Sequence, residues 1–68
     1  MIKFDKLWIK MKEEKITQYK LINVYNVSPA QITRLKRNSN VNTHTLNRLC
    51  QILNCKIEDI CEYIPDEE

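Results

Sequence analysis

The 68-residue sequence predicts an all-α fold, a compact bundle of five short helices that form one domain over residues 1–68. Apolar residues recur at spacings of three and four along most of the chain, which is the period of a helix with one buried face. Polar residues that can cap a helix precede several of these stretches. No internal repeat or low-complexity tract interrupts them. The expected helices span about residues 5–14, 17–25, 28–37, 43–53 and 57–63.

The first helix is expected to begin at Asp5, whose carboxylate can accept hydrogen bonds from the free N–H groups of a helix start. Residues 1–4 alternate in hydropathy and could form a short strand or an extended lead-in. Ile9 is out of phase with the apolar stripe and is expected at the surface. The stripe consists of Leu7, Trp8 and Met11. A small patch for contact with a second chain could be formed by Ile2, Phe4 and Ile9.

The stretch from 16 to 38 predicts two short helices joined by a tight turn. Thr17 can cap the first of these helices, and Leu21 and Tyr25 recur one turn apart on its buried face. Asn26 then ends the helix, because asparagine tolerates the left-handed conformation that a tight turn requires. Val27 is apolar enough to fill the corner between the helices.

The second of these helices begins with a hydroxyl and a proline. Ser28 can cap it, and Pro29 suits the first helical position, where its missing N–H costs nothing. Ile32 and Leu35 supply its buried side. Two short helices joined in this way outline a helix-turn-helix.

The fourth helix is expected to be capped by Asn42 or Thr43 and to stop at Asn54, in the left-handed conformation. Pro65 ends the regular structure, and residues 66–68 form a solvated tail. The buried stripe of the fourth helix is Leu46, Leu49, Cys50 and Leu53. The short fifth helix would bury Ile60 and Cys61.

The charges of the chain are separated along the sequence. No acidic residue occurs in the 43 residues from 15 to 57, although the chain contains nine. This segment carries seven positive charges, which indicates a nucleic-acid-binding surface. The alternative is an ordinary solvated surface with an accidental bias of sign. The basic residues are Lys15, Lys20, Arg34, Lys36, Arg37, Arg48 and Lys56.

The stretch from 16 to 38 resembles, without a gap, the helix-turn-helix of the Cro and phage-repressor family of DNA-binding proteins, the XRE type. Gln18 stands at the glutamine that usually opens the family's first helix, and Val27 and Ser28 stand at its turn. Ile32 and Leu35 match the apolar residues of its second helix. The likeness continues through TLNRLCQIL to IEDICEY. It implies a lambda-repressor-like domain that represses transcription as a homodimer on a two-fold operator.

The chain departs from the family pattern at four positions. The family commonly has glycine where this chain has Lys15, Asn26 and Asn38, and this chain contains no glycine. Asparagine accepts a positive φ at modest cost, whereas lysine is expected to lose roughly 1 kcal/mol or more there. Ile22 replaces the alanine that the family prefers where the two helices cross, which leaves the angle between them open.

The helix over 28–37 carries a polar arc opposite its apolar side, as a helix in the major groove requires. Arg34 is the main candidate for base readout, since a guanidinium can bond guanine O6 and N7 together. Thr33 and Ala30 suit a thymine methyl or a close base edge. Pro29 occupies a position that reads bases in the resembling repressors, but it can only pack against an apolar edge. The alternative for Arg34 and Ala30 is that they are ordinary exposed residues without a role in DNA binding.

Phosphate contacts are expected around that helix. Gln18 opens a helix whose free N–H groups and positive dipole end favour a phosphate, and Thr43 repeats this arrangement on the fourth helix. Ser28 could be only a cap, and Asn40 only a loop residue. The predicted phosphate set is Gln18, Ser28, Lys36, Arg37, Asn40 and Thr43.

The sequence offers no pattern for a metal, a cofactor or catalysis. His44 and the three cysteines lack the spacings of zinc ligands, and Cys50 and Cys61 fit apolar stripes. No carboxylate pair, nucleophile–base pair or phosphate loop occurs, so no enzyme activity is expected. One small domain leaves no room for a pocket that binds a small-molecule effector. An odd number of cysteines and the lack of an apolar span or signal pattern favour the cytoplasm, without a membrane partner.

The leading hypothesis is a regulator that binds a specific sequence of double-stranded DNA. The alternative is an antitoxin or adaptor that mainly contacts protein and has weak or no intrinsic DNA specificity. The acidic tail and the patch of Ile2, Phe4 and Ile9 motivate this alternative.

Overall fold

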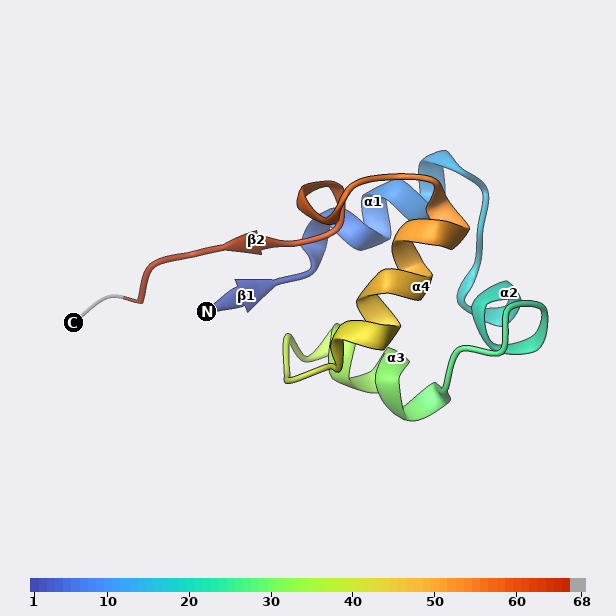
Figure 1. Ribbon diagram of the computed structural model, residues 1–68, viewed down its shortest axis with the longest axis horizontal. Coiled ribbons are helices and arrows are strands. Elements are labelled where there is room, and N and C mark those ends of the chain that lie inside the picture. Colours follow the sequence, from blue (N-terminus) through green and yellow to red (C-terminus); the bar gives the residue numbers. More distant parts are fainter. Residues whose placement is uncertain (67–68) are drawn as a thin grey trace.

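The computed structural model describes residues 1–66, in which four α-helices surround one core and the two ends of the chain pair as a small sheet (Figure 1). In the view of Figure 1, α4 runs through the middle, with α1 above it and α3 below. Of the expected solvated tail, Asp66 is exposed, and Glu67 and Glu68 lie outside the described residues. The elements are β1 (Ile2–Lys3), α1 (Asp5–Glu13), α2 (Gln18–Asn23), α3 (Pro29–Lys36), α4 (Thr43–Leu53), the 3₁₀ turn η1 (Ile57–Asp59) and β2 (Glu62–Tyr63).

The prediction of a fifth helix over residues 57–63 is wrong. The chain instead makes a single 3₁₀ turn and then enters β2, which pairs antiparallel with β1. The Asp59 carboxylate closes the turn by accepting a hydrogen bond of 2.9 Å from the backbone N–H of Lys56. The ladder with β1 then satisfies the following backbone groups, so tertiary pairing overrides the local helical pattern. The short strand expected as one possibility for residues 1–4 is present, in the register Ile2 opposite Tyr63 and Lys3 opposite Glu62.

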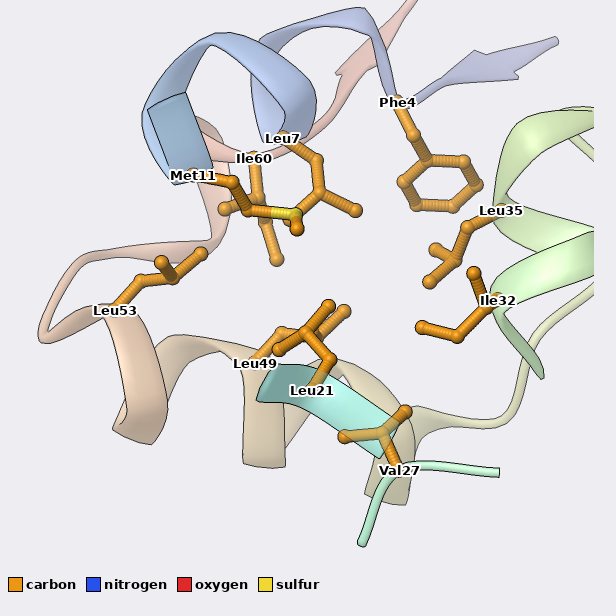
Figure 2. Packing of buried hydrophobic residues seen from close by; sticks show 10 residues of the cluster. All are labelled: Phe4, Leu7, Met11, Leu21, Val27, Ile32, Leu35, Leu49, Leu53 and Ile60. Carbon is orange, nitrogen blue, oxygen red and sulfur yellow. The ribbon is translucent and has the colours of Figure 1, made fainter. Parts of the chain in front are cut away.

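The core is one apolar cluster to which all four helices contribute (Figure 2). Several members, one from each of α1 to α4, are fully buried, which fits the stripes expected from the sequence. Five residues expected to face inward lie instead at its margin and are only partly buried: Trp8, Tyr25, Leu46, Cys50 and Cys61. The buried cluster consists of Phe4, Leu7, Met11, Leu21, Val27, Ile32, Leu35, Leu49, Leu53 and Ile60.

The expected surface patch of Ile2, Phe4 and Ile9 does not form. Phe4 is only 3% exposed, because the chain turns into the core between β1 and α1. Figure 2 shows its ring directed toward the cluster, opposite Leu35. Ile2 and Ile9 are both exposed.

Two of the four predicted helix caps form as expected. The Thr17 hydroxyl accepts from the N–H of Lys20 at 3.1 Å, and the Asn42 side chain accepts from the N–H of Thr45 at 2.7 Å. Asp5 is the first residue of α1 rather than its cap, so its carboxylate only lies near the positive end of the helix dipole. The hydroxyl of Ser28 makes no capping hydrogen bond, although Ser28 precedes α3.

All four α-helices are followed by a residue with a positive φ, and none of these residues is glycine. Asparagine occupies three of the positions, where its short polar side chain tolerates the left-handed conformation. Lysine occupies the fourth, at a steric cost. The values are 57° for Lys15, 58° for Asn26, 53° for Asn38 and 50° for Asn54.

Candidate nucleic-acid interface

The turn between α2 and α3 is held by its apolar corner. Val27 is 7% exposed and packs into the core, and its N–H donates to the carbonyl of Leu21 at 2.8 Å. Figure 2 shows the Val27 side chain next to Leu21. Asn26, with its positive φ, reverses the chain just before this contact. These contacts fix where α3 begins.

Polar side chains join α3 to α4. The amide oxygen of Gln31 accepts a hydrogen bond from the hydroxyl of Thr45 at 3.2 Å and another from the N–H of Asn42 at 3.4 Å. Arg48, one turn further along α4, donates to the carbonyl of Tyr25 at 2.6 Å. The second helix of the motif is therefore positioned from α4 as well as from α2.

The predicted base-reading face of α3 lies at the surface. Ile32 and Leu35 are 3% and 0% exposed, whereas the four predicted readers on the other side are all exposed. The hydroxyl of Thr33 donates to the carbonyl of Pro29 at 3.1 Å, so its hydrogen is used within the helix. This leaves the methyl group as the more available part of Thr33 for a base edge. The exposed readers are Pro29, Ala30, Thr33 and Arg34.

The predicted phosphate residues lie at the two ends of α3, in the loop after it, and at the starts of α2 and α4. Gln18 is the first residue of α2 and is partly buried, and Thr43 is the first residue of α4 and is exposed. Because Asn42 caps α4, the hydroxyl of Thr43 is not used as the cap. The remaining members, all exposed, are Ser28, Lys36, Arg37 and Asn40.

Two of the seven basic side chains counted in the acid-free segment are engaged within the protein. Arg48 is partly buried against the carbonyl of Tyr25, and Lys20 donates to the carbonyl of Lys15 at 3.4 Å. Among residues 1–66, the ion pairs join the Met1 amine to Asp66 and Lys10 to Glu14. Neither pair neutralises a basic residue of α3.

The thiols lie away from this surface, at the C-terminal end of α4 and beyond it. Burial raises the pKa of the Cys50, Cys55 and Cys61 thiols above its ordinary value. Cys61 also donates a hydrogen bond to the carbonyl of Ile57 at 3.4 Å. No group of three metal-binding side chains occurs in the part of the chain that the structure describes.

Sequence reasoning missed a residue that ties the motif to the N-terminus. The side chain of Asn38, just after α3, accepts a hydrogen bond of 2.9 Å from the N–H of Phe4, just before α1. Asn38 was expected only to provide a positive φ. Nothing in the local sequence indicates the second role, because the two residues are 34 positions apart.

The chain matches the family model of the Cro/C1-type helix-turn-helix DNA-binding domain over residues 6–66. The chain belongs to this family. It is also similar to the transcriptional regulator VanUg in its crystal structure, Form II, with 29% sequence identity and a TM-score of 0.86. That similarity covers 96% of this chain and 87% of the other. No curated protein sequence matches this chain.

The Cro/C1-type match confirms the resemblance to the Cro and phage-repressor family. The matched residues include α2 and α3, the two helices of the expected helix-turn-helix. The domain is a DNA-binding domain of the regulatory class, and its residues 1–66 form four α-helices where five were expected. None of the helices in residues 1–66 has the length and apolar character needed to cross a membrane.

Proposed function

We propose that this Cro/C1-type protein recognises a specific double-stranded DNA sequence by placing α3 in the major groove, and that it represses transcription from that site. The observation that carries the proposal is the outward face of α3. This face is small, polar or basic, and no acid precedes or follows it for many residues. Such a surface suits both the base edges and the phosphates of a duplex.

Arg34 is the proposed base reader. Its side chain is exposed in the last turn of α3 and forms no ion pair with any residue among 1–66. A bidentate contact with guanine contributes about 1–3 kcal/mol of discrimination. Selection of duplexes from a random pool should therefore return a conserved base pair for the wild type that Arg34→Ala no longer prefers. An unchanged selected sequence would remove Arg34 from the role of reader.

Lys36 is the matched control, since it lies on the same helix but is proposed to contact only phosphate. Lys36→Ala should weaken binding to selected and unselected duplexes by the same factor. It should also reduce the slope of log affinity against log salt by about one unit. A change in the selected sequence would contradict the assignment to phosphate.

The proposed active species is a homodimer on a two-fold operator in the cytoplasm, without a cofactor or a catalytic role. A dimer would place two copies of α3 in successive major grooves, about one helical turn of DNA apart. Footprinting on the selected duplex should show two protected half-sites with that spacing. Analytical ultracentrifugation of the complex should give two chains per duplex. One protected half-site and one chain would rule out the dimer.

A protein-binding role, as an antitoxin or adaptor, remains the second candidate. It is favoured by exposed apolar side chains away from α3, of which Ile9 is 62% and Tyr63 is 65% exposed. A titration with random duplex over a salt series separates the two functions. A regulator shows affinity that falls steeply with salt, whereas an adaptor binds negligibly even at low salt.

A further inference from the structure

A cavity of about 380 Å³ lies beside α3, between the turn of the helix-turn-helix and the start of α4. The sequence did not predict it, because its walls come from separate elements. On one side are Asn26, Ser28 and Gln31, from the turn and from α3. On the other side are His44 and Arg48, from α4.

The ionisable side chains that line this cavity are basic. His44 and Arg48 are four residues apart on α4, so they project from the same side of that helix. No carboxylate lines the cavity, and the sequence has none between Glu14 and Glu58. The residues that line it from the turn and from α3 have no titratable side chain. The cavity therefore favours a negatively charged group.

The cavity also has more hydrogen-bond donors than acceptors available. Arg48 uses one terminal nitrogen for the carbonyl of Tyr25, at 2.6 Å, and a guanidinium has five N–H donors in all. The amide oxygen of Gln31 is occupied by its bonds from α4, which leaves its NH₂ group as a donor. The Ser28 hydroxyl is not used as a helix cap. A ligand with several acceptor oxygens and no donors fits this set.

We propose that the cavity holds a phosphate of the DNA backbone, with Arg48 as a fixed contact and His44 as a contact that strengthens when it is protonated. The inference rests on the proposed function, since the phosphate belongs to a duplex lying along α3. Ser28 and Gln31 flank the first readers of α3, so a group in the cavity lies next to the base-reading face. Imidazole gains its charge between about pH 5 and 8, and charge-assisted bonds to phosphate are the stronger ones. DNA affinity should therefore rise as the pH falls.

The test is helped by the fact that the chain contains a single histidine. Affinity for the selected duplex is measured by fluorescence anisotropy from pH 8.0 to 5.5 at constant ionic strength. The wild type should bind about fivefold more tightly at the acid end, with a salt slope larger by about one unit. His44→Gln should lose this pH dependence, and His44→Lys should bind tightly throughout the range. The control Gln51→Ala, at an exposed position of α4, should behave as the wild type.

The imidazole resonance of His44 in the NMR spectrum reports directly on the cavity. Adding duplex to the full chain at pH 6.5 should shift this resonance. A wild-type pH dependence in His44→Gln, or a resonance that duplex does not move, would overturn the inference while DNA binding itself stands.

Inorganic phosphate, added alone at the same fixed pH, separates the two sources of the phosphate group. If inorganic phosphate shifts the His44 resonance much less than duplex does, the result supports a phosphate of the DNA backbone as the occupant of the cavity. An equal response, together with duplex affinity that does not depend on pH, would assign the cavity to a free anion and overturn the DNA contact. Absence of duplex binding by the wild type at every pH would overturn the proposed function itself.

Discussion

Replacing Lys15 with glycine should stabilise this protein, which is unusual for a surface substitution. Lys15 follows α1 with a φ of 57°, a conformation in which a Cβ atom approaches the following carbonyl oxygen. The neighbouring bonds are those of a regular helix end. The N–H of Lys15 donates to the carbonyl of Lys12 at 3.2 Å, and the N–H of Ile16 donates to the carbonyl of Met11 at 2.9 Å. Glycine keeps both bonds and removes the steric conflict.

The expected gain is the difference between two terms. A residue with a side chain loses about 1–2 kcal/mol in the left-handed conformation. Removing this strain is a gain, but glycine offsets part of it. A glycine loses more conformational entropy on folding than lysine does, which costs about 0.5–1 kcal/mol. The net stabilisation from Lys15→Gly is therefore about 0.7 kcal/mol, which for a domain of this size raises the midpoint of thermal unfolding by about 4 °C.

Thermal and urea unfolding followed by circular dichroism would measure this gain. Lys12→Gly is the matched control, since it also removes one exposed lysine but lies inside α1. Lys12 lies in the last turn of α1 and not at a positive φ, so glycine there costs up to about 1 kcal/mol and the control should lower the midpoint. If both variants lowered the midpoint by similar amounts, the claim that Lys15 is strained would be refuted.

Two hydrogen bonds and three thiols lead to other measurable outcomes. Asn38→Gly keeps the positive φ but leaves the N–H of Phe4 without its acceptor, so urea unfolding should show a loss of about 1 kcal/mol, opposite in sign to Lys15→Gly. Arg48→Met removes the donor to the Tyr25 carbonyl and should lower the free energy of unfolding by roughly 1–2 kcal/mol. Burial raises the pKa of the three thiols above its ordinary value, so the folded state keeps their protons longer than the unfolded state does. The free energy of unfolding in urea should hold up to about pH 8 and fall as the pH rises further.

The helices that carry the site could be predicted because their signals are local. Leu21, Ile32 and Leu35 follow the helical period, and their buried positions directed the predicted readers outward. The positive φ values could also be predicted, since the family's glycines fall on asparagine or lysine here. At each of these positions, the residue and its neighbours within one or two helical turns decide the backbone conformation and the buried face.

The parts that could not be predicted depend on distant partners. Residues 57–63 have a plausible helical stripe, but the choice of a strand depends on β1 at the other end of the chain. Arg48 was counted as a surface charge, and its bond to Tyr25 spans 23 positions of sequence. Phe4 was assigned to the surface because nothing nearby in sequence shows where the chain turns inward. The cavity beside α3 has the same origin, because its two walls are brought together only by the tertiary fold.

The bonds between α3 and α4 bear on the departure at Ile22. Ile22, where the family prefers alanine, is partly buried against the core, and apolar contacts of this kind have no preferred direction. Hydrogen bonds do have a preferred direction. The hydrogen bond between Gln31 and Thr45 therefore holds α3 against α4, and the bond from Arg48 to the carbonyl of Tyr25 holds α4 against the turn between α2 and α3. The helix proposed to read bases and the helix proposed to begin at a phosphate contact are thus held as one unit, so a duplex that bound both would meet them in a fixed relative position.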